Sequence, residues 1–345
     1  MMENILICPG KPSGILKKMI DASNIGGFFK EYYDNYENLD LKNKRIIFAI
    51  ELGNTGINIS LYRLIESLRK KGPKSLDNSV AGVLIHSSSE LYTRSEGRNL
   101  IYACNMMGCS FPGKPLVEAT GSLKNFINYK KHFSMSLEEA CLNSCKELSE
   151  RILSYDKRKI KEPKILVLHS SNSETSNTYM LWKLVEENLK NCSIKEIHIG
   201  HEQIIDCKGC SFKTCTHYGL QNNCYYGGIM VEEIYPSILE TDYLILLCPN
   251  YNDSITANIS AAVNRLTALY RKTPFYDKSL YSIIVSGHSG SDILAKQLIS
   301  GLNINKTFKL PSEFALMETA NYPKDILKVD NINEKASNFA KNILF

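Results

Sequence analysis

A run of polar side chains follows directly after an apolar segment near the middle of the chain. Residues 165–168 are all apolar, every residue from there to Thr178 is polar, and a helical pattern begins at Asn177. Helix N-termini attract anions because their first N–H groups are unpaired and the helix dipole is positive there. The segment is predicted either to bind a single terminal phosphate group or to be an ordinary polar connection. The candidate phosphate-binding residues are Ser170, Ser171, Ser173, Ser176, Asn177 and Thr178.

Two more polar loops follow apolar strand patterns later in the chain. One contains Pro249, Asn250, Tyr251 and Asn252, and the other contains Ser286, Gly287, His288 and Ser289. Ligands of open parallel sheets bind at the carboxyl ends of the strands, so we expect the three loops to hold a phosphate and a flat ring together. Tyr251 is predicted to stack on the ring. The alternatives are plain turn chemistry in the first loop and a solvated loop histidine at His288.

Four cysteines lie close together between residues 207 and 224. Cys207, Cys210, Cys215 and Cys224 are separated by two, four and eight residues. Four thiolates in so short a segment can hold a [4Fe–4S] cluster or, as a weaker alternative, a tetrahedral zinc ion. The third interpretation is a loop of plain thiols. Most of the other cysteines lie in apolar or helical settings and are predicted to be small buried hydrophobes.

The elements that must position these residues alternate regularly along the second half of the chain. Five strand patterns alternate with five helical patterns after Lys164, which predicts a parallel sheet covered on both faces. A weak internal repeat extends this fold to the first half. Residues 80–120 align with residues 280–320 without a gap, and residues 45–68 align with residues 242–266 with one gap. We therefore predict two copies of one α/β fold, the first with a lost or shortened early part.

Several segments of the second half also match patterns of a known family. Residues 169–178 match the pattern GS.R..SNT, and residues 206–210 match a cysteine loop that contains GC. Residues 247–251 match a strand end with the pattern sPvY, and residues 259–265 match in part a helix that contains DR. On these segments the second half resembles the NADPH-dependent FMN reductase and iron–sulfur flavoprotein family. Two departures are Ser173-Glu174 in place of the family's arginine and Gly227-Gly228 in place of an acidic pair.

The resemblance implies a fold, a cofactor and an activity. The fold would be two flavodoxin-like, doubly wound parallel-sheet domains in tandem, with residues 1–155 a degenerate copy without a flavin site. Residues 163–345 would bind FMN and carry the cysteine-rich insertion 207–224. The expected function is an FMN-dependent oxidoreductase that uses NADH or NADPH. The alternatives are an iron–sulfur electron carrier that docks on a redox partner protein and a non-enzymatic binding module on the same scaffold.

The first copy lacks the features of a flavin site. Its loop at residues 8–14 has few hydroxyl groups, and Glu51 to Asn54 stand where the second copy has the Pro249 loop. We therefore expect it to replace the second subunit of a dimer, giving a pseudo-dimer within one chain, with a further homodimer as a possible addition.

Composition excludes several other classes of function. The chain has 345 residues, 43% hydrophobic residues and a net charge of +5, which is too mild to favour nucleic-acid binding. No run of about 18 apolar residues predicts a membrane span, and no signal-peptide pattern stands at the N-terminus. We expect a cytoplasmic protein without nucleic-acid or membrane partners, and its 11 cysteines are expected to be thiols or ligands rather than structural disulfides.

Overall fold

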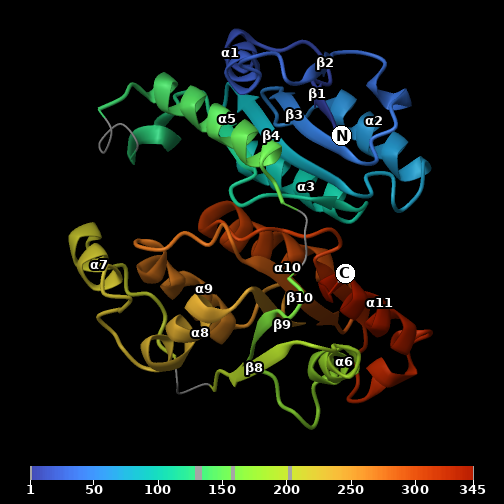
Figure 1. Cartoon of the computed structure of the whole chain (residues 1–345), viewed down its shortest axis with the longest axis vertical. Coiled ribbons are helices and arrows are strands. Elements are labelled where there is room, and N and C mark those ends of the chain that lie inside the picture. The colour runs from blue at the N-terminus through green and yellow to red at the C-terminus, as the bar shows by residue number, and fades with distance from the viewer. Residues whose placement is uncertain (1, 129–133, 157–159, 201–203, 345) are drawn as a thin grey trace. The chain divides into compact units, whose positions relative to one another are not determined.

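The computed structural model describes residues 2–128, 134–156, 160–200 and 204–344. The chain divides into two compact units (Figure 1). The first unit comprises Met1–Asp156 and Pro311–Glu313, and the second comprises Lys157–Leu310 and Phe314–Phe345. Each is an α/β unit built on its own parallel sheet. Among the described residues, every helix is too short or too polar to cross a bilayer.

The second unit has a five-stranded parallel sheet in the order β11-β10-β9-β7-β8. This is the flavodoxin-like order, in which the first and third strands of the fold lie side by side at the point where the chain changes direction. The strands are β7 Lys164–His169, β8 Ser193–His198, β9 Tyr243–Asn250, β10 Ser279–Ser286 and β11 Ala315–Thr319. The helices are α6 Asn177–Glu186, α7 Phe212–Gly219, α8 Tyr235–Glu240, α9 Ala257–Tyr270, α10 Ser291–Leu298 and α11 Ile332–Leu344.

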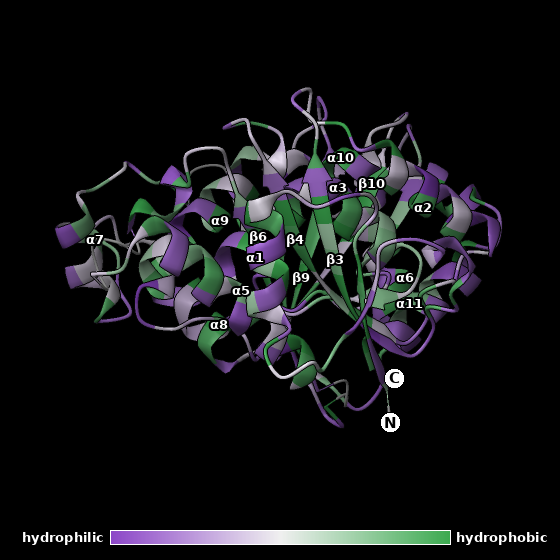
Figure 2. Ribbon diagram, turned by 90° about the horizontal axis from the view of Figure 1, so that it is seen from above, coloured by the Kyte–Doolittle hydropathy of each residue, from purple (hydrophilic) through white to green (hydrophobic). Residues whose placement is uncertain are grey.

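Helices cover both faces of this sheet, which is why its central strands are apolar throughout. Helices α6 and α11 pack on one face, where Trp182, Tyr281 and Phe339 belong to one buried cluster. Helices α8 and α10 contact the strands from the other side. In Figure 2 the central strands are green, and the helices around them show purple on parts of their surface. A parallel strand buried on both faces needs side chains that avoid water on both sides.

The first unit repeats this topology. Its sheet has the order β2-β1-β3-β4-β5, with β6 also paired to β4. The strands are β1 Glu3–Ile7, β2 Lys30–Tyr32, β3 Lys44–Leu52, β4 Ser79–Ser87, β5 Cys109–Ser110 and β6 Leu116–Ala119. The α-helices are α1 Gly14–Ser23, α2 Ile59–Lys70, α3 Thr93–Asn105 and α5 Leu137–Leu153. The 3-10 turns of the chain are η1 Tyr36–Asn38, η2 Lys124–Phe126 and η5 Asp325–Lys328, and its π-helical turns are η3 Met230–Ile234 and η4 Ile299–Ile304.

The strand registers of the two units match residue by residue at the far edge of each sheet. Val83 is the partner of Leu116 in the first unit, and Ile283 is the partner of Leu316 in the second. The predicted tandem of two α/β sheets is confirmed. The early part of the first unit is present as β1, α1 and β2. It is shortened after β2, because the described residues between β2 and β3 contain no counterpart of the segment that carries the cysteines and α7.

Candidate functional site

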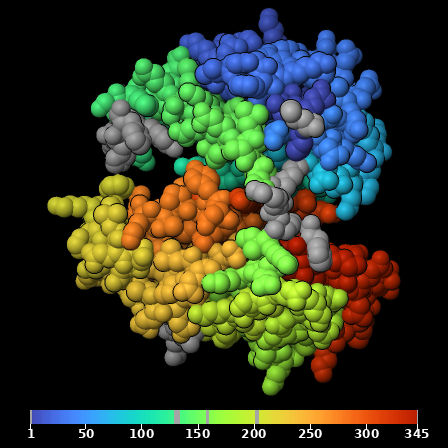
Figure 3. Space-filling model, in the orientation of Figure 1, coloured from blue at the N-terminus to red at the C-terminus, as the bar shows by residue number. Residues whose placement is uncertain are grey.

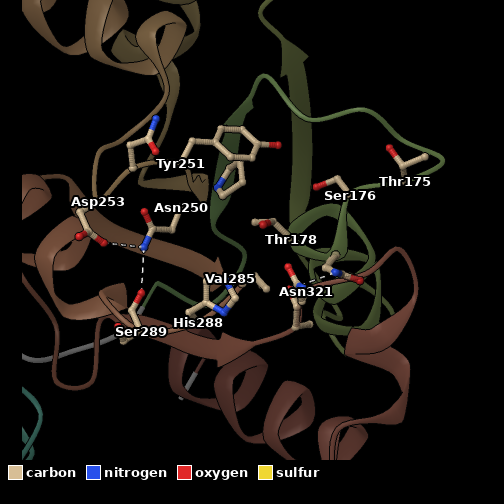
Figure 4. Close-up of a pocket in the computed structure, with 15 residues that line it drawn as sticks. Thr175, Ser176, Thr178, Asn250, Tyr251, Asp253, Val285, His288, Ser289 and Asn321 are labelled. Carbon is tan, nitrogen blue, oxygen red and sulfur yellow. Dashed lines mark hydrogen bonds between the residues drawn. The ribbon is translucent and has the colours of Figure 1, made fainter.

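A pocket of about 590 Å³ lies at the carboxyl ends of strands β7, β9, β10 and β11 in the second unit (Figure 4). Three of the loops that line it are those predicted from the sequence, and the loop after β11 is the fourth. In Figure 4, Ser176 and Thr178 lie on one side of the pocket, and Asn250, Tyr251 and Asp253 lie on the other. The lining residues are Thr175 to Thr178, Pro249 to Asp253, Val285, Gly287, His288, Ser289, Ala320 and Asn321.

The N-terminus of α6 forms one wall of the pocket. Ser176 caps the helix, because its hydroxyl accepts the N–H of Tyr179 at 3.3 Å. The first N–H groups of an α-helix have no partner inside the helix, so this wall offers donors and a positive dipole end to an anion. Thr178 is 1% exposed and adds a hydroxyl to the same wall.

Asn177 supports this wall and does not offer its side chain to a ligand. Its amide donates to the carbonyls of Ala320 at 3.3 Å and Tyr322 at 2.8 Å. Its side-chain oxygen accepts the N–H of Ile326 at 3.3 Å. These three bonds tie the start of α6 to the segment after β11. The prediction that Asn177 binds phosphate is therefore limited to its backbone N–H.

A tight turn after β9 forms the opposite wall. Asn252 and Asp253 both have φ of 55°, and Tyr251 and Ser254 pair on either side of them. Two central residues with positive φ define a type I′ turn, for which Asn and Asp are favoured. The turn leaves Tyr251 64% exposed at its start, with the ring free to cover a flat ligand.

Asn250 joins the turn after β9 to the loop after β10. Its amide donates to Asp253 Oδ1 at 3.2 Å, Ser286 Oγ at 3.1 Å and the carbonyl of Ser289 at 3.2 Å. Its side-chain oxygen is buried and accepts no hydrogen bond from any described residue. Because Asn250 lines the pocket, this oxygen is an acceptor for an N–H group of a ligand.

Glycines bring the loop after β10 close to its neighbours. A Cβ at Gly290, whose φ is +93°, would lie 2.2 Å from Asp253 Oδ1, and one at Gly287 would lie 2.9 Å from Asn321 Oδ1. None of the described residues that line the pocket is Lys or Arg. An anion here would therefore be held by hydroxyls, N–H groups and the α6 dipole.

Four of the predicted residues do not line this pocket. Ser286 is fully buried beneath it, where its hydroxyl bonds Ser291 Oγ at 2.7 Å. Ser170, Ser171 and Ser173 line a separate pocket beside β8. The sequence prediction omitted Thr175, Asp253, Val285, Ala320 and Asn321. The repeat places Ala320 and Asn321 at the end of the last strand, which is the one signal that could have found them.

The four clustered cysteines all line one pocket of about 230 Å³. The predicted loop contains a helix here, α7, which carries Cys215. Within the described ranges, no three His, Cys, Asp or Glu side chains are arranged as ligands of a metal ion. The cysteines are thus gathered but not in coordination geometry.

A buried arginine stands beside these thiols. Arg265 lines the same pocket and is 2% exposed. It donates to the carbonyls of Gly227 at 2.7 Å and Ile205 at 3.4 Å, so it holds both ends of the cysteine segment. No carboxylate of the described residues pairs with it, and its Nε has no partner among them. A buried unpaired cation is costly, so this pocket suits a negatively charged occupant.

In the first unit a carboxylate occupies the corresponding strand-end position. Glu51 Oε2 accepts the N–H of Ser13, the N-cap of α1, at 3.0 Å. Glu51 Oε1 lies 2.6 Å from His86 Nδ1, which is 3.1 Å from Ser13 Oγ. Burial alone would raise the pKa of Glu51, but the bonds from His86 and Ser13 hold it below its usual 4.5. The first unit therefore satisfies its helix N-terminus with its own anion.

Comparison with known proteins finds one family model that matches much of the second unit. Residues 163–321 match the family model of NADPH-dependent FMN reductase, which confirms the resemblance seen in the sequence. No curated protein matches the chain.

Solved structures similar to the chain include two oxidoreductases and a protein with a bound riboflavin phosphate derivative. RosB with bound 8-demethyl-8-formylriboflavin-5′-phosphate is 13% identical, with a TM-score of 0.41, over 53% of this chain and 77% of that one. An NAD(P)H:quinone oxidoreductase from Methanothermobacter marburgensis is 13% identical, with a TM-score of 0.39, over 53% and 98%. An azoreductase from Bacillus anthracis is 15% identical, with a TM-score of 0.36, over 53% and 100%.

Proposed function

We propose that this chain, whose second unit matches the NADPH-dependent FMN reductase family, is a flavin-dependent oxidoreductase that binds FMN in the 590 Å³ pocket. The observation that carries the proposal is the position of that pocket. It lies at the strand ends β7, β9 and β10, where the flavodoxin-like order places FMN, and it combines a helix N-terminus with a turn that presents an exposed tyrosine.

The residues present fit FMN part by part. The phosphate would lie at the N-terminus of α6, held by first-turn N–H groups and by the hydroxyls of Ser176 and Thr178. The ring would lie between Tyr251 and the backbone of Gly287 to Ser289. The unpaired oxygen of Asn250 would accept an N–H from the ring edge.

The chain's own residues would position the cofactor and exclude water, and bound FMN would supply the redox chemistry. NADH or NADPH would deliver the hydride. No Lys or Arg is present among the described lining residues, so no side-chain cation would balance the charge of a further phosphate group in this pocket.

Flavin content and reduction test the proposal. The purified full-length protein should take up FMN and quench its fluorescence, and the bound flavin should bleach on anaerobic addition of NADH or NADPH. A colourless protein that takes up no FMN would refute the proposal and favour a non-enzymatic binding module instead.

A second candidate function is an iron–sulfur flavoprotein that carries electrons. It is favoured by the pocket that gathers Cys207, Cys210, Cys215 and Cys224 beside the unpaired cation of Arg265. Lys306 adds a second cation near Cys207, although burial and Arg271 lower its pKa. Four thiolates would hold a [4Fe–4S] cluster, or less favourably zinc, and their negative charge would pair with these cations.

Metal content decides between the two candidates. Anaerobic purification followed by measurement of iron, labile sulfide and zinc per chain should give about four irons and four sulfides per chain if the cluster is present. Bound flavin without metal would support the reductase and reject the iron–sulfur flavoprotein. One zinc per chain would indicate that the cysteine segment is a structural zinc site.

We further propose that the first unit no longer binds flavin and stands in for the second subunit of a dimer. The Glu51 carboxylate supports the first part, because it already places an anion against the N–H of Ser13 at the start of α1. The repeat of the fold supports the second part.

A further inference from the structure

A second pocket of about 490 Å³ lies beside the first one, and the functions proposed above assign no ligand to it. It uses the first half of the loop after β7, whereas the 590 Å³ pocket uses the second half, and no described residue lines both. Its other wall comes from the end of β8. The lining side chains used below are His169, Ser171, Asn172, Tyr179, Glu196 and His198.

Two polar groups that line this pocket are buried and have no hydrogen-bond partner. Ser171 is 5% exposed and His169 is 3% exposed. Among the described residues, neither Ser171 Oγ nor His169 Nε2 makes a hydrogen bond. A buried polar group without a partner destabilises the fold, and such groups in native proteins require an explanation. A ligand in the pocket would provide the missing partners.

The hydrogen bonds around His169 define which of its nitrogens carries the proton. The backbone N–H of Ser171 donates to His169 Nδ1 at 3.3 Å, so Nδ1 is an acceptor. Burial lowers the pKa of His169 below its usual 6.5, which keeps the ring neutral near pH 7. In a neutral imidazole the other nitrogen then carries the hydrogen. His169 Nε2 is therefore a donor, which argues against a metal ion at this nitrogen.

A carboxylate lies next to that donor. Glu196 Oε1 is 3.3 Å from His169 Nε2, out of line for a hydrogen bond. Burial would raise the pKa of Glu196, but donors from Tyr179, Trp182 and Lys183 hold it below its usual value. The ionised Glu196 disfavours a polyanionic ligand and offers an acceptor beside the donor.

Aromatic side chains also line the pocket next to this donor–acceptor pair. The ring of His169 packs against those of Tyr179 and His198, with centroids 5.0 Å apart in both pairs. The amide of Asn172 adds a further donor, since its oxygen already accepts the N–H groups of Glu174 and Thr175. The pocket thus places donors and an acceptor side by side next to aromatic surface.

We propose that this pocket binds a planar nitrogen heterocycle whose edge carries a hydrogen-bond acceptor next to a donor. The acceptor would take the hydrogens of His169 Nε2 and Ser171 Oγ, and the donor would bond Glu196. An adenine edge and the carboxamide of nicotinamide both have this arrangement. The site is independent of the flavin, and its ligand differs from FMN in carrying no phosphate into the pocket.

The chain's single tryptophan provides a direct reporter of this site. Trp182 donates its indole N–H to Glu196 Oε2 at 2.9 Å, so a ligand that bonds Glu196 should change its emission. We would titrate the flavin-free, full-length protein with adenosine and with nicotinamide, and in parallel with their N,N-dimethyl analogues, which lack the donor. A saturable change with adenosine alone identifies a nucleobase site, and one with nicotinamide alone identifies a carboxamide site.

Substitution of the unpaired hydroxyl completes the test. Ser171→Ala should weaken binding about tenfold, the effect of one hydrogen bond, while Ser154→Ala in the first unit should leave it unchanged. Because Ser171 Oγ has no partner in the free protein, Ser171→Ala should fold with an unchanged or raised melting temperature. The proposal is overturned if neither heterocycle binds saturably, if the dimethyl analogues bind equally well, or if Ser171→Ala binds like the natural protein.

Discussion

At the scale of single residues, two side chains of the proposed flavin pocket contribute in different ways. Thr178 offers a buried hydroxyl to the ligand, whereas Asn250 spends three hydrogen bonds on holding two loops together. The Thr178 hydroxyl would contribute a bond to the phosphate. Asn250 would contribute both preorganisation of the loops and a bond from its side-chain oxygen to the ring edge.

Thr178→Val removes the hydroxyl and keeps the shape of the side chain. A hydrogen bond to a charged group contributes about 1.5–3 kcal/mol, so FMN affinity should fall by about ten- to hundredfold. Fluorescence titration with FMN measures the change. Thr178→Ser keeps the hydroxyl and should bind FMN nearly as well as the natural protein. Equal losses of affinity in both variants would show that the hydroxyl does not bond the phosphate.

Asn250→Ala releases the turn after β9 from the loop after β10. We expect FMN affinity to fall about tenfold or more, because the two walls of the pocket must then be ordered at the expense of binding energy and the proposed bond from the ring edge to the Asn250 oxygen is lost. The same titration measures it, with Asn143→Ala as the control, since the exposed Asn143 bonds only its helix neighbour Glu147. Unchanged affinity in Asn250→Ala would show that the loops hold their positions without this side chain.

At the scale of elements, the side chain of Asn177 attaches the N-terminus of α6 to the segment after β11. Asn177→Ala would leave two carbonyls and one N–H without their present partners. The expected loss is about 2–4 kcal/mol from the free energy of unfolding of the second unit. Urea denaturation followed by Trp182 emission reports this unit, and Asn188→Ala, which removes one exposed bond, is the matched control.

The start of α1 in the first unit should make stability depend on pH. The pKa of Glu51 is lower in the folded protein than its usual 4.5. Its carboxylate therefore stabilises the fold above that value, and this contribution is lost as the pH falls through the lower folded pKa. Denaturation curves should show the gap between the natural protein and Glu51→Gln widest near neutral pH and shrinking in acid. A gap that is constant with pH would mean that the charge of Glu51 is not involved.

The sequence predicted elements better than side-chain directions. Strands β7, β9 and β10 and the cap of α5 at Ser136 could be read from apolar runs and capping chemistry, because these are local. The direction of each hydroxyl between His169 and Asn177 depends on turns that involve Asn172. Ser171 therefore lines the pocket beside β8, and the apolar pattern of the strand could not predict this. The role of Asn321 depends on which strand ends meet, a tertiary property that no local pattern carries.

At the scale of the whole molecule, the two units share a fold but differ in how they use their strand ends. The second unit leaves a helix N-terminus, a buried acceptor and an exposed tyrosine facing an open pocket. The first unit bonds Ser13, Glu51 and His86 to one another. This contrast supports the proposal that a duplicated flavodoxin-like unit has lost one of its two sites.

This division of roles predicts one FMN per chain in a protein that is monomeric in solution. Titration of the full-length chain should saturate at one flavin, because the carboxylate of Glu51 bonds the N–H of Ser13 at the start of α1 and would repel a phosphate there. Light scattering after size-exclusion chromatography should give the mass of a single chain, since the first unit would already supply the second half of the dimer. Two flavins per chain would refute the loss of the first site. A stable homodimer with one flavin per chain would keep that loss and refute the pseudo-dimer, so the two measurements separate the two parts of the proposal.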